Sequence, residues 1–369
     1  MRKGWEYKKL GEVCEVVTGT TPKTNIPEYW GKGHYWVTPA ELNDTTVYID
    51  KTERQITDEA LSKTKLRLLP VGTVLLSSRA PIGKVAIANA EMYCNQGFKN
   101  CICSEAIYNK YLFYFLRLKK DYLNSLGRGA TFKEISKSIV ESIKIPLPPK
   151  STQLAIVSEL DKINELIRLK KEQLKDFDNL AQSLFYEMFG DPVENEKGWE
   201  VKKLGEICEI FAGGDKPKDM CEIQNNKYIY PVIANGEGEK GILGYTKNCR
   251  VTKEAVTIGA RGASIGNCRI VKNGFTPAIR LLTLIPTGSI DCCFLYYFVK
   301  DLNYKQNGAG QAQLTVPNIK CEFIPLPPLS LQRLFAQRIE QIEREKSEVQ
   351  KSIQDLETLL ASRMQYWFE

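Results

Sequence analysis

Histidine is almost absent from this chain. His34 is its only histidine, so a Ser-His-Asp or Cys-His arrangement cannot recur along the sequence. Neither a GxxxxGKS/T phosphate-binding loop nor a GxGxxG dinucleotide fingerprint occurs. The Asn/Asp-Pro-Pro-aromatic element of amino-methyltransferases is missing too, because Lys150 and Leu329 follow the two Pro-Pro pairs. We therefore expect a chain without catalytic residues of its own.

Long apolar runs and paired metal-ligand cysteines are also lacking. No uncharged stretch approaches the length needed to cross a bilayer, and residues 1–6 have no apolar core of a signal peptide. The eleven cysteines do not show the CxxC pairs of a structural zinc site. These features predict a cytoplasmic protein with no bound metal and no membrane association, whose cysteines are small buried apolar residues.

The composition is that of a soluble globular protein, with 43% hydrophobic and 26% charged residues. A length of 369 residues accommodates two domains of ordinary size, each able to bury its own core. The formal net charge of +7 is mildly basic. Such a charge permits binding to nucleic acid without establishing it.

Two sequence motifs occur twice, which indicates an internal duplication. GWEYKKLGEVCE at residues 4–15 returns as GWEVKKLGEICE at 198–209, and IPLPP at 145–149 returns at 324–328. The first pair is 198 − 4 = 194 residues apart and the second 324 − 145 = 179, so the second module is shorter by 194 − 179 = 15 residues. This long period is typical of a duplicated domain rather than a solenoid repeat. Function is therefore expected to need two related recognition events.

A long amphipathic helix is predicted after each IPLPP motif. The first spans residues 151–189 and the second 330–367, with apolar residues stepping by three and four as in a coiled coil. Ser151 is expected to cap the first helix, and Gly190 follows its end. The expected interface between the helices comprises Leu160, Ile163, Ile167, Leu174, Phe177, Leu184, Ile339, Ile342, Val349, Ile353, Leu356 and Leu360.

An antiparallel pairing of these helices would bury both apolar stripes most simply. A helix of roughly 35 residues is about 50 Å long, so the pair would place one module at each end, with internal pseudo-two-fold symmetry. Duplex DNA repeats its groove face about every 34 Å, so two such modules could meet the same side of one duplex. The periodicity leaves open the alternative that the helices only dimerise the protein.

Each globular module is predicted to be of the α+β class. The expected short strands cover residues 12–18, 72–78, 206–211 and 255–259. One internal helix is expected in each module, at 106–126 and at 290–303, where Tyr, Phe and Leu recur at helical spacing. The sequence does not define the strand order.

An arginine follows an apolar strand in each module. In the first module Arg79 precedes Ala80, Pro81 and a glycine, and in the second Arg261 precedes Gly262. An arginine fork can bind a guanine edge or a phosphate, and small neighbours let the backbone approach closely. A salt bridge at the end of the strand is the alternative for either arginine.

Glycine-bearing polar loops supply further candidates for DNA contact. Amide and basic side chains in such loops are suited to reading base edges, and the residues concerned are Asn95, Gln96, Lys99, Arg128, Lys133, Gln311 and Gln313. Phosphate contacts are expected from Lys23, Lys84, Lys216 and Arg280. Ordinary solvent-exposed loops carry the same residue types, so a plain surface role is the alternative for each.

The order of these parts resembles the specificity subunit of a Type I restriction-modification system. The resemblance rests on GWExKKLGE opening each half, IPLPP closing each module, LDKINELI at 160–167 and FYEMFGDP at 185–192. It covers essentially the whole chain. It implies two target-recognition domains, at 1–149 and 193–328, that alternate with two conserved helical spacers, at 150–192 and 329–369.

The resemblance also implies a division of labour among subunits. This non-catalytic chain would recognise a bipartite target in double-stranded DNA. Two methyltransferase subunits would bind S-adenosylmethionine and modify adenine, and restriction subunits would act as motor-nucleases with ATP and Mg²⁺, so that this chain holds no cofactor. The family's Arg-Gly-rich loop maps approximately onto Arg79 and Arg261. A coiled-coil adaptor whose globular ends bind proteins is the alternative function.

Overall fold

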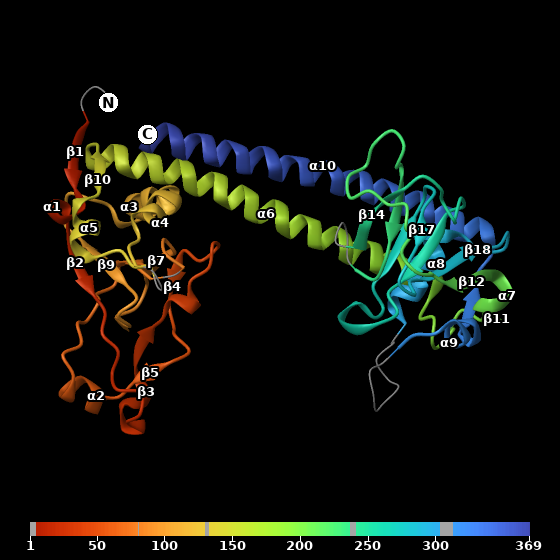
Figure 1. Ribbon diagram of the computed structural model, residues 1–369, viewed down its shortest axis with the longest axis horizontal. Coiled ribbons are helices and arrows are strands. Elements are labelled where there is room, and N and C mark those ends of the chain that lie inside the picture. Colours follow the sequence, from red (N-terminus) through yellow and green to blue (C-terminus); the bar gives the residue numbers. More distant parts are fainter. Residues whose placement is uncertain (1–4, 80, 130–132, 237–240, 303–312) are drawn as a thin grey trace. The chain divides into compact units, whose positions relative to one another are not determined.

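The computed structural model describes residues 5–79, 81–129, 133–236, 241–302 and 313–369 (Figure 1). The chain forms two compact units, one comprising Met1–Lys170 with Ser352–Glu369 and the other Lys171–Lys351. Each unit contains one globular module, half of one long helix and half of the other. The described part of the chain mixes helices and sheets, as expected for the α+β class.

The first module is built around a five-stranded sheet. Its strand order is β2 (Cys14–Thr18), β9 (Lys99–Cys103), β6 (Val74–Leu76), β7 (Val85–Ala88) and β4 (Tyr48–Ile49). Neighbouring strands are antiparallel except β4 and β7, which are parallel. Helix α3 (Asn109–Leu118) packs on β6 and β7. Because Lys119 leaves the helical conformation with ψ of 14°, α4 (Lys120–Leu126) is a separate helix and the single helix expected over 106–126 is wrong.

A smaller sheet lies at the end of this module away from β1 and β10 (Figure 1). It joins β5 (Gln55–Ile56), β3 (Trp30–Val37) and β8 (Tyr93–Cys94), flanked by η1 (Pro27–Tyr29), η2 (Pro39–Glu41) and α2 (Asp58–Lys63). The α2 helix begins at an N-cap, because the Thr57 hydroxyl accepts the backbone N–H of Ala60. Trp36 and Ile56 are buried between these elements, and the Arg54 guanidinium lies 3.9 Å above the Trp30 ring.

The two repeated sequence motifs are partners in one small sheet. In the first module β1 (Glu6–Lys9) pairs antiparallel with β10 (Lys144–Leu147), and in the second β11 (Glu200–Lys203) pairs with β19 (Phe323–Leu326). A helical turn follows the first strand in each copy, α1 (Leu10–Val13) and α7 (Leu204–Ile207). The strands expected from residues 12 and 206 therefore begin two residues later, at Cys14 and Cys208.

The second module repeats the central sheet with one strand fewer. Its order is β12 (Cys208–Ala212), β18 (Leu282–Pro286), β15 (Ala255–Ile258) and β16 (Cys268–Val271), all antiparallel. A three-stranded sheet of β14 (Ile242–Thr246), β13 (Tyr230–Ile233) and β17 (Thr276–Pro277) lies beside it. Helix α8 (Cys292–Asp301) packs on the central sheet, and its N-terminus is capped by the Asp291 carboxylate. The remaining short elements of the two modules are α5 (Lys137–Ser142), η4 (Gly262–Ser264) and α9 (Val316–Cys321).

The long helices α6 (Lys150–Phe189) and α10 (Leu329–Phe368) each contain 40 residues. The first begins one residue earlier than expected, so Ser151 lies inside its first turn. All twelve residues of the expected interface are buried or half-buried. Leu154 and Leu334, which follow the same spacing, are instead exposed. Among the described residues, no helix is both long enough and apolar enough to span a membrane.

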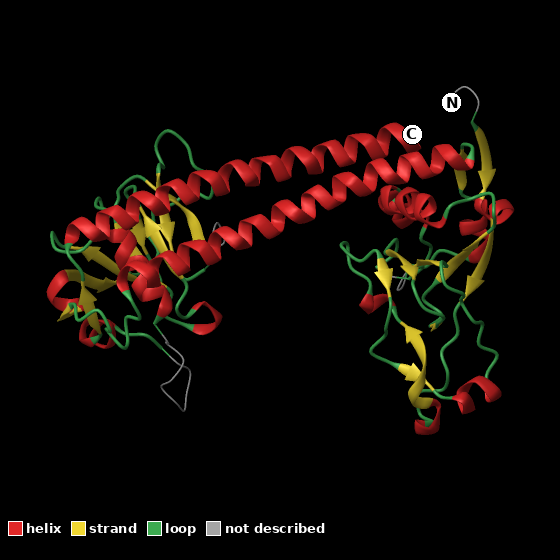
Figure 2. Ribbon diagram, turned by 180° about the vertical axis from the view of Figure 1, so that it is seen from behind, coloured by secondary structure: helices red, strands yellow, loops and turns green. Residues whose placement is uncertain are grey.

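Within each unit the two helices run antiparallel and side by side (Figures 1 and 2). In the first unit the Glu159 carboxylate binds the guanidinium of Arg363 and accepts the Trp367 indole N–H at 3.0 Å. In the second unit Lys346 pairs with Asp178 at 2.8 Å, and further along α6 the Phe185 ring packs against Phe335. Residue numbers therefore rise along α6 as they fall along α10. The antiparallel coiled coil expected from the sequence is present within each unit.

A fully buried glutamine fixes the first turn of each long helix to its module. The amide of Gln153 accepts the Tyr108 backbone N–H at 2.8 Å and donates to the Ala106 and Pro148 carbonyls at 2.9 Å. Gln332 does the same in the second unit. Its partners are the Asp291 N–H (2.8 Å) and the carbonyls of Pro327 (2.7 Å) and Ser289 (3.5 Å). Each amide thereby joins its helix to the loop before α3 or α8.

Replacing either buried glutamine by alanine is expected to destabilise the unit that contains it. Each change leaves a backbone N–H and two carbonyls without their partner, and an unsatisfied buried group costs about 1 to 3 kcal/mol. Hydrogen exchange should show faster opening of the first unit in Gln153→Ala and of the second in Gln332→Ala. Gln341→Ala, at an exposed position of α10, is the matched control. Equal exchange in Gln332→Ala and Gln341→Ala would contradict this role.

Candidate nucleic-acid interface

Arg79 stands at the end of strand β6, on a short loop that returns to β7. The Ser77 hydroxyl closes this loop, because its Oγ donates to the Pro81 carbonyl at 2.7 Å and accepts the Lys84 backbone N–H at 2.9 Å. Gly83 makes the turn with φ of 87°, a conformation that costs glycine little. The Arg79 side chain is 45% exposed. The buried strand thus anchors the backbone of this arginine while its guanidinium reaches solvent.

Glu134 holds the Arg79 guanidinium from a separate segment. Its Oε2 accepts the Arg79 Nε–H at 2.9 Å, and its Oε1 accepts the Lys99 ammonium at 2.9 Å. The backbone N–H of Ile135 donates to the Ser78 carbonyl at 3.0 Å and joins the two segments. Burial alone would raise the pKa of Glu134, but the hydrogen bonds from Lys99 and Arg79 outweigh it and hold that pKa below its ordinary range. Arg79, Glu134 and Lys99 are called the Arg79 clamp below.

Lys99 is the buried member of the Arg79 clamp. Its side chain is only 6% exposed, and its ammonium also donates to the Ser78 hydroxyl at 3.3 Å. Because a charge inside a protein needs a partner, the carboxylate of Glu134 accounts for this lysine. The sequence predicted a direct DNA contact for Lys99, but a buried side chain is not placed to make one. Its ammonium supports Glu134 from below and does not reach the surface.

Arg128 and Lys133 lie beside the Arg79 clamp. Arg128 exchanges two backbone hydrogen bonds with Glu134, at 3.0 and 2.9 Å. Its side chain is exposed, as is that of Lys133 next to Glu134. Four basic residues therefore lie near Glu134: Arg79 and Lys99 bind its carboxylate, whereas Arg128 and Lys133 are its neighbours through the backbone. The solvent-facing set is Arg79, Arg128 and Lys133.

The Asn95–Gln96 loop lies against the same strand end. The Gly97 carbonyl accepts the backbone N–H of Ser78 at 2.7 Å, and the Asn95 side chain accepts the N–H of Gly97 at 2.9 Å. Gln96 is exposed, and the Thr21 hydroxyl donates to its Oε1. Gly19 is required here, because a Cβ at that position would lie 1.9 Å from the Asn95 carbonyl oxygen. Of the two amides, Gln96 is the one presented to solvent.

Lys23 and Lys84 are placed differently from one another. The Lys23 side chain is exposed, and the backbone carbonyl of Lys23 accepts the Trp30 indole N–H at 3.2 Å. The Lys84 ammonium is half-buried and donates to the Pro39 carbonyl at 3.2 Å. Lys84 therefore connects the β6–β7 loop to η2 of the same module, whereas Lys23 is available for contact with a ligand.

Arg261 repeats the Arg79 arrangement in the second module. It follows strand β15, and its Nη2 donates to the Gln313 Oε1 at 3.0 Å. The Leu314 N–H donates to the Ala260 carbonyl at 3.0 Å, as Ile135 does toward Ser78. Both Arg261 and Gln313 are exposed. Arg261, Gln313 and Leu282, which lies on the adjacent strand, are called the Arg261 clamp below.

A strained turn lies next to the Arg261 clamp. Ile279 and Arg280 have φ of 50° and 60°, a left-handed conformation that is rare for a β-branched residue. The backbone N–H groups of these two residues donate to the Gly214 and Gly213 carbonyls at 2.7 and 3.0 Å. Strain of this kind persists where surrounding bonds enforce it, and it clusters at functional sites. The turn presents the exposed Arg280 side chain to solvent.

Asn235 connects the strained turn to the base of Arg261. Its Oδ1 accepts the Ala260 backbone N–H at 2.9 Å, and its Nδ2 donates to the Ile279 carbonyl at 2.8 Å. In the first module the corresponding Ser78 N–H bonds directly to the carbonyl of Gly97. In the second module the Asn235 side chain therefore takes the place of this direct backbone hydrogen bond, and it bridges the segments that contain Ala260 and Ile279.

The last candidates of the second module are Lys216 and Gln311. Lys216 is exposed two residues beyond Gly214, close in sequence to the strained turn. Gln311 lies outside the described residues. Within the described ranges, no group of three or more His, Cys, Asp or Glu side chains is placed to hold a metal ion.

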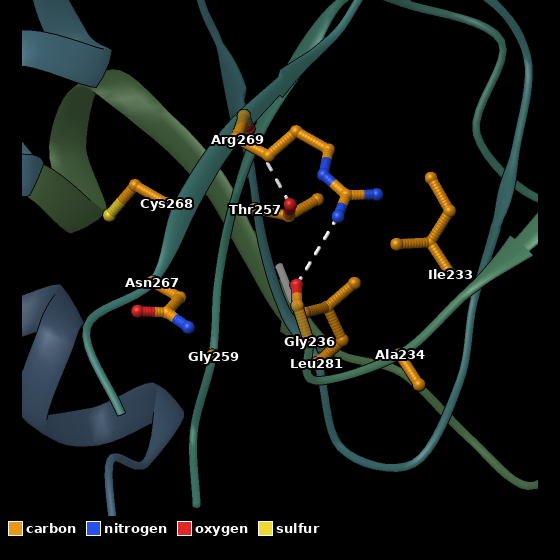
Figure 3. A pocket seen from close by; sticks show the side chains of 9 residues that line it. All are labelled: Ile233, Ala234, Gly236, Thr257, Gly259, Asn267, Cys268, Arg269 and Leu281. Carbon is orange, nitrogen blue, oxygen red and sulfur yellow. Dashed lines mark hydrogen bonds between the residues drawn. The ribbon is translucent and has the colours of Figure 1, made fainter. Parts of the chain in front are cut away.

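The second module contains a small cavity (Figure 3). Its volume is about 70 Å³, and its lining residues include Thr257, Gly259, Asn267 and Arg269. The Arg269 guanidinium points across it and donates to the Gly236 carbonyl at 3.2 Å. Burial lowers the pKa of Arg269. This volume has room for a few water molecules, and none of the candidates for DNA contact lines it.

Glu134 and Asn235 are the site residues that the sequence did not reveal. A positional pattern could have identified Glu134, because it precedes its IPLPP motif by 145 − 134 = 11 residues and Gln313 precedes the second copy by 324 − 313 = 11. No comparable pattern identifies Asn235, because its counterpart in the first module is a backbone carbonyl and not a side chain. Its role depends on a contact between distant segments.

Residues 2–176 and 196–358 match the family of Type I restriction modification DNA specificity domains, and since these ranges cover more than half of the chain, the chain belongs to that family. Among its relatives is the MjaIX specificity subunit, a type I restriction enzyme subunit from Methanocaldococcus jannaschii. The two are 32% identical over 371 residues, which cover 90% of this chain and 85% of the relative. The EcoprrI specificity subunit from Escherichia coli is 26% identical, over 85% of this chain and 82% of its own.

Solved structures share the fold. A chain from a study of complex assembly and conformational transition of the type I R-M system aligns with a TM-score of 0.68 and 22% identity, covering 99% of this chain and 97% of that one. The S subunit of a Type I restriction-modification system from M. genitalium aligns with a TM-score of 0.58 and 17% identity, covering 99% and 96%. The fold class expected from the sequence is confirmed.

Replacing Asn235 by alanine is expected to destabilise the second unit and release the strained turn. The change leaves the buried Ala260 N–H and the Ile279 carbonyl unpaired, at about 1 to 3 kcal/mol for each unsatisfied group. The predicted result is a lower melting temperature with faster hydrogen exchange at residues 258–261 and 278–281. Asn273→Ala, at an exposed position of the same module, is the control. Exchange in these segments that matches the control would exclude a bridging role.

Proposed function

We propose that this chain is the DNA-recognition subunit of a type I restriction-modification complex, in which each module reads one half of a bipartite target. The single observation that carries the proposal is the recurrence of one arrangement in both modules. An arginine at the end of a core strand is held by a side chain that precedes the IPLPP motif by the same number of residues. Two copies of one reading device suit a target in two parts.

The chemistry of the exposed side chains fits contact with duplex DNA. In the Arg79 clamp, Glu134 engages only the Nε of Arg79, so both Nη groups can donate to the O6 and N7 of one guanine in the major groove. Arg128 and Lys133 supply positive charge for phosphate oxygens next to that base, and Lys216 and Arg280 do so in the second module. Gln96 and Gln313 add amides, which suit adenine edges.

The long helices are proposed to set the distance between the half-sites and to dock the partner subunits. In this scheme the recognition domains are residues 1–149 and 193–328, and the helical spacers are 150–192 and 329–369. Exposed leucines on the helices, among them Leu166, Leu169 and Leu359, offer apolar surface to two methyltransferase subunits. Those subunits would bind S-adenosylmethionine. Restriction subunits would supply the ATP- and Mg²⁺-dependent steps, and this chain would be non-catalytic.

Lengthening both helices is expected to widen the unspecified spacer of the target without changing either half-site. Seven residues inserted after Lys170 in α6 and after Lys351 in α10 add about 10 Å at 1.5 Å per residue while nearly preserving the phase of the apolar stripe. This distance equals about three base pairs at 3.4 Å each. Methylome sequencing of cells that express the variant with its methyltransferase partner measures the spacer directly. An unchanged spacer would refute the role of the helices as a ruler.

Binding to the DNA target, as mapped by methylome sequencing, is expected to weaken steeply with rising salt concentration. Each phosphate contact contributes about −0.9 to the slope of log K against log salt concentration, so Arg128→Ala should reduce the slope by roughly that amount on every sequence. Arg261→Ala should lose about 1 to 3 kcal/mol of discrimination at one base pair. Lys175→Ala, exposed on α6, is the control. Absence of salt-dependent binding by the assembled complex would favour the alternative, an adaptor whose modules bind proteins.

A further inference from the structure

We propose that Lys99 and Glu134 are positioning residues, which together form a neutral support that fixes the Arg79 guanidinium and leaves its full positive charge for DNA. The proposal rests on the function proposed above and deepens it. Neither residue needs to touch DNA. Glu134 determines where the guanidinium lies, and the buried ammonium of Lys99 determines the net charge that the clamp presents.

The geometry of the Arg79 clamp separates these two tasks. The two carboxylate oxygens of Glu134 have different partners, Oε2 the exposed Arg79 and Oε1 the buried Lys99. Without the ammonium below it, the carboxylate would neutralise the arginine above it. With the ammonium in place, Glu134 still fixes the guanidinium by a hydrogen bond, and the local sum is +1 from Arg79, +1 from Lys99 and −1 from Glu134, which equals +1.

The second module reaches the same local charge without a buried lysine. Gln313 holds Arg261 with a neutral amide, so no counter-charge is needed beneath it. The strand registers show what replaces Lys99. Lys99 pairs across from Thr18 in β2, and Leu282 pairs across from Ala212 at the corresponding position of β12. An apolar residue therefore occupies the strand position of Lys99, and the local sum is +1 from Arg261 alone.

The support residues therefore differ as a matched set between the modules. A buried lysine accompanies a glutamate, and a buried leucine accompanies a glutamine. Combining one residue of each set would be unfavourable. Glutamate with leucine would cancel the charge of the arginine, and glutamine with lysine would leave a buried ammonium without a carboxylate. Exchange of the whole set should preserve function, whereas exchange of one member should not.

The two supports also direct different edges of the arginine toward DNA. Glu134 binds Arg79 through Nε, which leaves the two terminal Nη groups of that guanidinium facing away from its support. Gln313 binds Arg261 through Nη2 and so occupies part of that terminal edge. The Nε2 amide of Gln313 has no partner among the described residues, so it can donate beside Arg261. Different donor patterns on one shared plan suit two different half-sites.

The test uses the full chain assembled with its methyltransferase subunits and compares Lys99→Leu, Glu134→Gln and the double variant with the unchanged protein. The probe is a duplex carrying the target mapped by adenine methylation, and a duplex with a scrambled first half-site measures discrimination. Lys99→Leu should lower affinity for the target about tenfold and reduce the salt slope by roughly 0.9, the effect of one lost charge. Glu134→Gln should lower discrimination at the first half-site. The double variant should bind within about threefold of the unchanged protein, since it recreates the support found in the second module.

A reciprocal exchange guards against a simple loss of folding. Leu282→Lys combined with Gln313→Glu builds the Arg79 type of support under Arg261 and should retain binding, whereas Gln313→Glu alone should weaken it. The proposal is overturned if Lys99→Leu binds and discriminates as the unchanged protein does, or if both double variants bind as poorly as the single ones. If the unchanged complex shows no salt-dependent binding to the mapped duplex, the proposed function itself fails. That outcome is distinct from both of the others.

Discussion

A glutamine side chain buried in the first turn of each long helix holds the architecture of each unit together. Gln153 and Gln332 satisfy the same three kinds of backbone group: the N–H of the residue that precedes the module's internal helix, the carbonyl two residues before it, and a proline carbonyl of the IPLPP motif. A loop that enters the interior must have its polar groups paired. Because one amide provides these pairs, the direction in which each helix leaves its module is fixed.

The strand before each helix links this frame to the arginine clamps. In both modules one continuous segment carries the side chain that holds the arginine, then a short helix, then the strand that pairs with the opening motif, and then the long helix. The eleven-residue spacing from Glu134 or Gln313 to IPLPP is thus a structural distance. It keeps the support of the arginine in register with the frame, while the loops that cover the smaller sheets are free to differ.

Electrostatics explain why the clamps can differ and still serve one purpose. The Arg79 clamp contains an ion pair in which Lys99 is buried and Glu134 half-buried, so the buried ammonium depends on its bond to the carboxylate. The Arg261 clamp avoids burying charge altogether, with Leu282 and Gln313 in the same places. The backbone N–H of the residue before the arginine also has a different partner in each module, a backbone carbonyl in the first and the Asn235 side chain in the second. Recognition surfaces can therefore diverge around a constant exposed guanidinium.

The sequence by itself determined the duplication, the two long helices and the arginines at the strand ends, because these depend on local periodicity and on motifs that recur along the chain. The boundaries of the two long helices were predicted to within one residue, because each helix begins directly after an IPLPP motif. The tertiary structure alone decided that Lys99 is buried, that Glu134 and Asn235 belong to the site, and that the first internal helix breaks at Lys119. These properties arise from contacts between segments far apart in sequence, and a residue's type does not reveal whether a distant carboxylate will lie beside it.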